Sequence, residues 1–429
     1  MTLIIKGGRV IDPANGIDGI LDIYIEGDKI VEPPKNAKKS NDKQNGAEVI
    51  DAAGKIVAPG LIDMHCHLRE PGFEYKEDIA SGTRAAAAGG FTTICCMPNT
   101  NPVNDSRSVT EFIMAQARKA GFCKVLPIGA ITKGSMGLEL AEMGEMAEAG
   151  CVGFSDDGKP VANAEMMRHA LEYAKTFDRT IISHCEEPNL SAGGVMNEGA
   201  VSTRLGLRGI PAAAEEVMVA REISLAKLTG GRVHIAHVST AGSVELIRRA
   251  KADGINVTAE TCPHYFTLTD EGVMSYNTYL KVNPPLRTET DRKAIIGGLS
   301  DGTIDVIATD HAPHAASEKD VEFDLAPFGI SGLETALPLS MALANSGLIP
   351  MVELFKKLTI NPARALGLAL PSLSPGSIAD IVLIDPETEK TVRPEALISK
   401  GKNTAFSGLV LKGWPVETIH EGKKIAVKL

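Results

Sequence analysis

Histidine and aspartate side chains recur directly after short apolar runs, a position from which they could bind metal ions. The run GLIDM is followed by His65 and His67, and residues two apart on a strand point to the same face. Other apolar runs end in the remaining candidates, which are Asp156, Asp157, His184, His237 and Asp310. Imidazole and carboxylate groups suit Zn²⁺, and two zinc ions can share one carboxylate and one water. The pattern predicts a hydrolytic site with one or two zinc ions.

Strands and helices that could bring these residues together alternate from Lys55 onward. Short apolar runs such as FTTICCM, RTIISHC and RVHIAHVS are each followed by a helical pattern, which gives eight strand–helix units. We therefore predict an α/β fold with a (β/α)8 barrel over residues 56–367, closed by one helix in MVELFKKLTINPARALGL. Barrel enzymes carry their sites at the carboxyl ends of the strands, so the candidates should meet at one mouth.

Both ends of the chain have strand patterns instead. TLIIKGGRVID and ILDIYIEGDKIV begin the sequence, and GSIADIVLID and SGLVLKGWPVETIH lie near its end. We predict that residues 1–55 and 368–429 form one small β-rich domain beside the barrel. The polar residues 33–45 are predicted to be a loop, and the charged residues 315–327 a mobile loop over the site.

Composition narrows the class of protein. The formal net charge of −10 argues against nucleic acid or an anionic membrane as the main partner. No apolar run is long enough to cross a bilayer, and the first residues lack a signal-peptide pattern. The seven cysteines contain no Cys-x-x-Cys pair. We therefore expect a reduced, cytoplasmic protein.

A series of motifs extends along most of the chain. In order, they are PGLIDMHCHLREPG, MPNTNP, GFSDDG, ISHCEE, HIAHVST, ETCPHY, KVNPPLR and ATDHAPH. These motifs resemble those of bacterial-type dihydroorotases in the amidohydrolase superfamily, and the resemblance runs from Gly7 to Gly422. It implies a zinc-dependent hydrolase that interconverts dihydroorotate and N-carbamoyl-L-aspartate in pyrimidine biosynthesis. It also implies a homo-oligomer, with aspartate transcarbamoylase as a candidate partner.

The resemblance also implies a role for each candidate. One zinc would be held by His65, His67, Asp157 and Asp310. The second zinc would be held by Asp157, His184 and His237. The substrate carboxylate would be bound by Arg69, Asn99 and His314, and the pyrimidine ring by Asn283, Phe328 and Gly329. Asp310 would accept a proton during attack and pass it to the leaving ring nitrogen.

Three alternatives remain open from the residues alone. Asp156 competes with Asp157 as the bridge, and strand alternation does not decide between them. A hydantoinase or allantoinase would carry a carboxylated lysine at the end of the fourth strand, whereas Lys159 lies beyond the aspartate pair. A metal-free scaffold for aspartate transcarbamoylase would have lost metal ligands, and here all of them are present.

Overall fold

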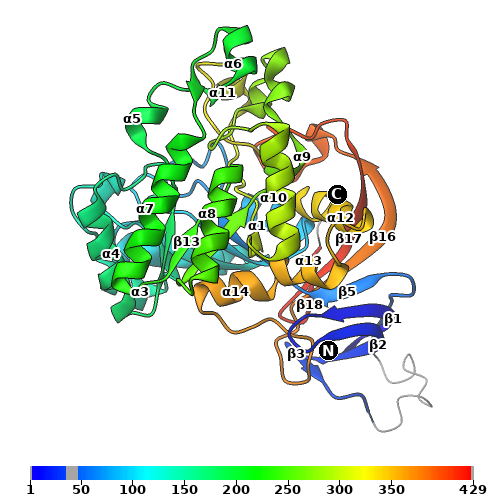
Figure 1. The fold of residues 1–429 in the computed structure, drawn as a ribbon. Coiled ribbons are helices and arrows are strands. Elements are labelled where there is room, and N and C mark those ends of the chain that lie inside the picture. The colour runs from blue at the N-terminus through cyan, green and yellow to red at the C-terminus, as the bar shows by residue number, and fades with distance from the viewer. Residues whose placement is uncertain (1, 35–46, 427–429) are drawn as a thin grey trace.

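Eight parallel strands follow one another around a barrel in chain order, with helices on the outside (Figure 1). The structure, a computed structural model, describes residues 2–34 and 47–426. The barrel strands are β6 (Leu61–Cys66), β7 (Phe91–Cys96), β8 (Lys124–Gly129), β9 (Gly153–Phe154), β10 (Thr180–Ser183), β13 (Val233–Ile235), β14 (Val257–Thr261) and β15 (Val306–Ile307). The covering helices are α1 (Ile79–Ala88), α2 (Arg107–Ala120), α3 (Met143–Ala149), α4 (Ala164–Thr176), α7 (Ala213–Thr229), α8 (Ala241–Ala252), α10 (Glu289–Asp301) and α12 (Ala336–Asn345). The predicted barrel is confirmed.

The seam between the first and last barrel strands is completed by a side chain. Beyond the short strand β15, Cys66 and His311 form a single β-bridge. The Asp63 carboxylate accepts hydrogen bonds from the backbone N–H of Thr309 at 2.9 Å and from its hydroxyl at 2.6 Å. Burial raises the pKa of Asp63 to about 7, although these bonds oppose the shift. Asp63 therefore links the two strand ends that lead into the predicted ligands.

Local sequence explains why the strands and helices form where they do. Strands β6 and β7 are buried throughout, as expected for apolar parallel strands covered on both faces. Helix α1 begins where the Asp78 side chain accepts a hydrogen bond from Ser81 N at 2.7 Å. Thr240 caps α8 in the same way, only three residues after His237. A short, capped connection thus fixes the backbone that carries a predicted ligand.

The helix expected to close the barrel is two helices, α13 (Met351–Leu358) and α14 (Ile360–Leu366). Thr359 separates them with φ −135° and ψ −84°, which is not a helical conformation. The cause is Pro362, which has no N–H to donate to the carbonyl of Leu358 and whose ring clashes with it. The prediction of one continuous helix was therefore wrong.

Extra elements lie in the loops that follow the strands, at the opposite end of the barrel from α14 (Figure 1). Between β10 and α7 the chain forms α5 (Pro188–Ser191), β11 (Met196–Asn197), α6 (Ala200–Leu205) and β12 (Gly209–Ile210). The other loops contain η3 (Lys133–Ser135), α9 (Pro263–Thr267), η4 (Asp270–Ser275), η5 (Thr278–Leu280) and α11 (Ala316–Lys319). The eight-unit pattern gave no indication of these insertions, which build up the side of the barrel that carries the site.

The two ends of the chain meet in a second, mixed sheet (Figure 1, blue and red). Its strands are β1 (Thr2–Asp12), β2 (Ile17–Glu26), β3 (Lys29–Val31), β4 (Glu48–Asp51), β5 (Ile56–Pro59), β16 (Ile381–Thr391), β17 (Val410–His420) and β18 (Lys423–Lys424), and η6 (Pro394–Ala396) lies between β16 and β17. Strand β5 joins the ends by pairing with both β1 and β16. The expected pairing of the two termini is confirmed, while the domain boundaries stay a prediction. Most of the predicted loop at residues 33–45 lies outside the described residues.

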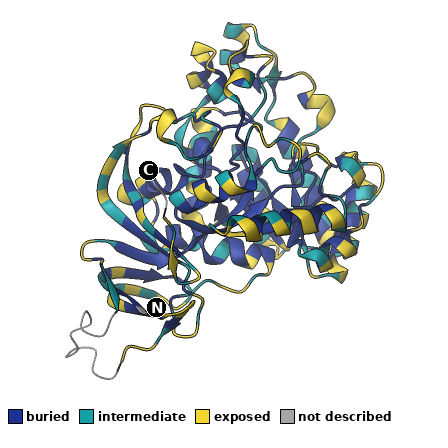
Figure 2. Ribbon diagram, turned by 180° about the vertical axis from the view of Figure 1, so that it is seen from behind, coloured by how far each residue is buried: buried dark blue, intermediate teal, exposed yellow. Residues whose placement is uncertain are grey.

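Buried residues concentrate on the strands and on the inward faces of the helices (Figure 2). One cluster joins Ile128 and Ile182 of the barrel strands to Leu366 of α14. The terminal sheet has its own cluster, which includes Ile5, Ile25 and Ile381. Within the described part of the chain, no helix is both long and apolar enough to cross a membrane.

Candidate metal centre

The strand ends deliver the predicted ligands to one place through unusual backbone geometry. His65 lies on β6, and the other ligands follow the ends of their strands by one to three residues. His237 and Asp310 have φ values of 34° and 45°, and the neighbouring Arg69 has φ 63°. Residues with side chains rarely adopt this left-handed conformation, which costs about 1–2 kcal/mol each. The surrounding fold must therefore hold these three backbones in place.

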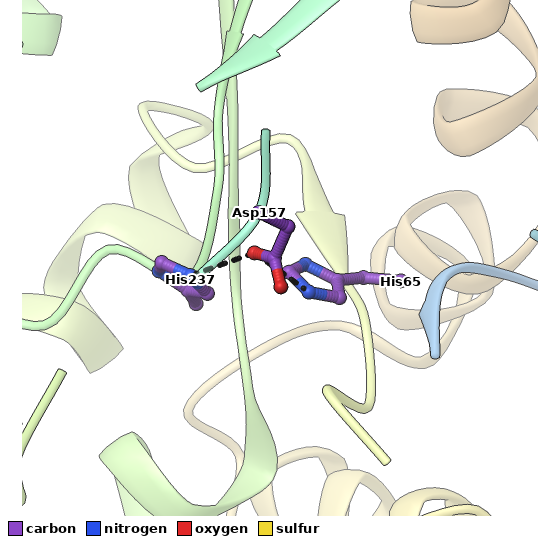
Figure 3. A group of neighbouring side chains, drawn as sticks. All are labelled: His65, Asp157 and His237. Carbon is purple, nitrogen blue, oxygen red and sulfur yellow. Dashed lines mark ion pairs between the residues drawn. The ribbon is translucent and has the colours of Figure 1, made fainter. Parts of the chain in front are cut away.

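Asp157 is at the centre of the cluster. Its Oδ1 lies 3.3 Å from His65 Nε2 and 3.5 Å from His237 Nε2, on opposite sides of the carboxylate (Figure 3). Its Oδ2 lies 3.5 Å from His67 Nε2. A carboxylate placed in this way can bind a different metal ion with each oxygen. Asp157 therefore has the geometry of a bridging ligand.

Two overlapping groups of ligand atoms are close enough to hold metal ions. In each group the ligand atoms lie within 4.8 Å of one another, and the members are His65, Asp157 and His237 in one and His65, His67 and Asp310 in the other. Asp310 Oδ1 lies 3.1 Å from His67 Nε2 and 3.5 Å from His65 Nε2. All five residues are buried.

His184 extends the cluster on the side of His237. Its Nδ1 lies 2.8 Å from His237 Nε2 and 3.8 Å from Asp157 Oδ1. Its Nε2 faces the other way, 3.4 Å from the side-chain nitrogen of Asn283 and 3.8 Å from a Glu186 oxygen. His184 can therefore contribute Nδ1 to the same centre as His237 and Asp157.

The donor set itself fits metal ions. Among the described residues, neither His65 Nε2 nor Asp157 Oδ1 has a hydrogen-bond partner, although both atoms are buried and face each other. Buried polar atoms are normally satisfied, so such a pair needs an explanation. Burial raises the pKa of Asp157, but the nearby His65 and His237 outweigh it and hold that pKa well below its usual value. The carboxylate is ionised at neutral pH, as a metal ligand must be.

Partners outside the cluster orient two of the imidazoles. His65 donates from Nδ1 to Glu260 at 2.6 Å, and His67 donates from Nδ1 to the amide oxygen of Asn99 at 2.8 Å. Because these bonds engage Nδ1, Nε2 is the nitrogen of each ring that remains for a metal ion, and it faces Asp157 and Asp310. Asn99, predicted to bind substrate, thus also contacts a predicted metal ligand.

The neighbouring aspartate has a different environment. The Asp156 carboxylate accepts hydrogen bonds from the backbone of Ile131 at 2.8 Å and of Thr132 at 3.1 Å. It also accepts one from the Thr132 hydroxyl. Lys159 is exposed in the turn after β9 and is not part of the cluster. Geometry therefore distinguishes Asp157 from Asp156, which strand alternation could not do.

A cavity of about 160 Å³ opens onto the cluster. Its wall is formed by His67, Arg69, Asn99, Asp157, Gly158, His184, His237, Asn283, Asp310, Ala312, Phe328 and Gly329. Of the predicted site residues, His65 and His314 lie behind this wall. The space suits a small molecule rather than a polymer.

Arg69 brings positive charge to this cavity without a carboxylate partner. Its Nε donates to the carbonyl of Pro313 at 3.2 Å, and a terminal nitrogen lies 3.4 Å from His314 Nε2. The ion pairs found among the described residues include none with Arg69. Burial lowers the pKa of the guanidinium from its usual high value, while Asp310 and Asp157 oppose the shift. The group remains charged and can receive an anion.

His314 is held neutral behind Arg69. Burial lowers its pKa to about 3, and the charge of Arg69 adds to the shift. Lys76 Nζ lies 3.4 Å from Nδ1 and can only donate, so the ring proton is on Nε2. His314 Nε2 therefore donates a hydrogen bond to the carbonyl of Phe328 at 2.8 Å.

Sequence reasoning missed Glu260, which lies at the end of β14. Besides His65, it lies 3.2 Å from His234 Nε2, so His234 belongs to the same network. Burial raises the pKa of Glu260, but the nearby His65 and His234 lower that pKa by a larger amount. The Glu260 carboxylate therefore stays ionised. The strand-end rule that found the ligands could also have found Glu260 in the motif ETCPHY.

Comparison with known proteins agrees with this geometry. The family described as Dihydro-orotase-like matches residues 54–243. The chain is 59% identical to the dihydroorotase of Pelotomaculum thermopropionicum over 99% of this chain and 98% of that protein. It is 55% identical to the dihydroorotase of Geobacter metallireducens over 99% of both.

Solved structures with the same fold include hydantoinases. The L-hydantoinase (dihydropyrimidinase) of Arthrobacter aurescens superposes with a TM-score of 0.87 at 25% identity, covering 99% of this chain and 96% of that one. The D-hydantoinase (dihydropyrimidinase) of a Thermus species gives a TM-score of 0.81 at 25% identity, covering 98% and 94%. Sequence identity to the dihydroorotases is more than twice as high. The chain therefore belongs to the dihydroorotase family of cyclic amidohydrolases.

Proposed function

We propose that this cavity binds dihydroorotate and N-carbamoyl-L-aspartate and interconverts them in pyrimidine biosynthesis, with two zinc ions. The observation that supports it best is the unpaired guanidinium of Arg69 in the same small cavity as the histidine–aspartate cluster. Dihydroorotate carries a carboxylate, whereas hydantoin and allantoin do not. A planar guanidinium can meet a carboxylate at two points.

Zinc is the metal we propose because the donors are imidazole nitrogens and carboxylate oxygens. One ion would be held by His65, His67, Asp157 and Asp310, and the other by Asp157, His184 and His237. When bound, zinc polarises a carbonyl group and makes a strong nucleophile available at neutral pH. Asp157 would be the ligand that the two ions share.

The chain's own residues would position the substrate and move the proton. Arg69 and Asn99 would fix the substrate carboxylate, with His314 contacting Arg69 from behind the cavity wall, while Asn283, Phe328 and Gly329 would contact the ring. Asp310 faces the cavity and is held ionised, because the charges of His65 and His67 outweigh the effect of burial on its pKa. It can accept a proton during attack and return it to the ring nitrogen as the amide bond breaks.

The cellular setting forms part of the same proposal. All seven cysteines are free and buried, which suits a reducing cytoplasm. The resemblance to bacterial-type dihydroorotases supports a homo-oligomer and a partnership with aspartate transcarbamoylase.

Turnover of dihydroorotate by the purified protein is the direct test. We expect hydrolysis of dihydroorotate and little or none of hydantoin or allantoin, because only dihydroorotate offers Arg69 a carboxylate. Chelation should abolish turnover, and added Zn²⁺ should restore it. Full activity in a sample shown to be free of metal, or a preference for hydantoin, would refute the proposal.

Arg69→Ala should raise the KM for dihydroorotate by roughly a hundredfold, because a buried carboxylate would lose its charged partner. Metal content should stay at the wild-type level, since Arg69 contacts Pro313 and His314 rather than the predicted ligands. Arg69→Lys keeps the charge but not the two-point geometry, so its KM should lie in between. Steady-state kinetics and metal analysis of both variants check this, and an unchanged KM in Arg69→Ala would exclude the assigned role.

A further inference from the structure

A short segment that carries two predicted substrate contacts is tied down by two lysines. We call residues 320–329 the strap; it ends in Phe328 and Gly329, which line the cavity. Lys281 Nζ donates to the strap carbonyls of Phe323 at 2.9 Å and Asp324 at 3.0 Å. Lys319 Nζ donates to the carbonyl of Pro327 at 2.7 Å. Both ammonium groups therefore bind the strap through its backbone.

Among the described residues, neither lysine forms an ion pair with a carboxylate. Lys281 and Lys319 are only 3% and 2% exposed, and no carboxylate of the described residues lies within ion-pair distance of either. Burial lowers the pKa of Lys281 to about 8 and that of Lys319 to about 7. Burying an amine is unfavourable unless its donors are satisfied, and here backbone carbonyls satisfy them. The two amines therefore bind the strap backbone and not a carboxylate.

Lys281 also contacts the two strap residues that line the cavity, Phe328 and Gly329. The backbone N–H of Gly329 donates to the carbonyl of Lys281 at 2.9 Å. The Phe328 ring lies against Lys281, with Nζ 4.8 Å from the ring centre, and the Phe328 carbonyl accepts a hydrogen bond from His314 Nε2. Gly329 has φ 126°, and a Cβ there would approach the Ala312 carbonyl oxygen to 2.8 Å. The backbone at the end of the strap thus has little freedom while the lysine contacts remain.

We propose that Lys281 and Lys319 are positioning residues that hold the strap in its substrate-binding geometry before the substrate arrives. The identity of the substrate in this inference rests on the proposed function. The conformation of the strap without substrate does not depend on that function. It departs from the mobile loop that composition suggests for residues 315–327, because Lys319 and Phe323 are buried rather than solvated.

Hydrogen exchange of the metal-loaded wild-type protein without substrate tests the state of the strap. The amides of Ala326 and Gly329, bonded to the carbonyls of Glu322 and Lys281, should exchange slowly and change little when dihydroorotate is added. Exchange at the rate of an unfolded chain, followed by protection on binding, would overturn the proposal. This measurement needs no variant and no turnover.

Lys319→Met and Lys281→Met test the lysines themselves. Each should speed exchange in the strap and raise the KM for dihydroorotate roughly tenfold to a hundredfold, with kcat and metal content changed far less. Since the two variants remove different contacts, failure of one to fold leaves the other informative.

Lys357→Met is the matched control. Lys357 is also buried and donates to a backbone carbonyl, that of Ile304 at 2.7 Å, but it lies on α13, away from the strap. Its replacement should leave the KM and strap exchange unchanged. Wild-type KM and strap exchange in folded Lys319→Met or Lys281→Met would overturn the proposal. If the wild type does not turn over dihydroorotate at all, the proposed function fails, while the exchange results still decide the state of the strap.

Discussion

Replacing Asp157 with alanine is expected to remove the two metal ions that we propose and to lower dihydroorotate turnover by roughly a thousandfold or more. The reason is its central place: one oxygen lies 3.3 Å from His65 and 3.5 Å from His237, and the other lies 3.5 Å from His67. No other carboxylate of the described cluster contacts all three of these imidazoles. Metal analysis after dialysis, combined with anomalous diffraction, measures each ion separately.

Two further variants make this result specific. Asp156→Asn neutralises the adjacent carboxylate, but an amide oxygen can still accept from the backbone of Ile131 and Thr132. It should keep both ions even if it lowers the melting temperature. His237→Ala should mainly empty the site shared with His184. Near-normal metal content in Asp157→Ala, or equal loss of both ions in His237→Ala, would show that the bridge is another residue.

Asp310→Asn is expected to lower kcat by roughly a hundredfold to ten-thousandfold, with a smaller change in KM. The amide has the size of the carboxylate but cannot take up and return a proton. One oxygen remains as a ligand near His67, which lies 3.1 Å away, so some metal should be retained. Metal content measured on the same samples separates lost proton transfer from lost metal.

The control for this variant is Asp305→Asn, which changes the same residue type just before β15. Asp305 pairs with Lys251 at 2.6 Å and does not line the cavity. Its kcat should stay near the wild-type value. A kcat for Asp310→Asn within about threefold of the wild type at full metal content would remove Asp310 from the proton-transfer role.

Much of the candidate site was predictable because parallel strands in a barrel all end on the same side. Periodicity predicted the eight units, and the residues at the ends of the apolar runs included His65, His184 and His237. The split between α13 and α14 was missed, although Pro362 indicates it, since proline cannot continue a helix that begins at Met351. These features depend on local sequence, which is why sequence patterns can predict them.

Other parts of the site depend on contacts between distant residues. His65 meets Glu260, 195 positions later, and Asp63 meets Thr309, 246 positions later. No local pattern encodes such pairs. The predicted loop at residues 315–327 shows the same limit, because its charged composition suggests solvated side chains, whereas Lys319 and Phe323 are buried. Asp156 and Asp157 could be separated only once the Thr132 backbone was in place.

The left-handed backbone at Arg69, His237 and Asp310 has an evolutionary consequence. Glycine would be under less strain at each of these positions because it has no Cβ, and the difference is largest, about 1–2 kcal/mol, for Arg69. A descendant released from selection for turnover could therefore gain folding stability by losing them. Substitutions at these positions that abolish activity can therefore increase the free energy of unfolding. Selection for the reaction is what keeps arginine, histidine and aspartate there.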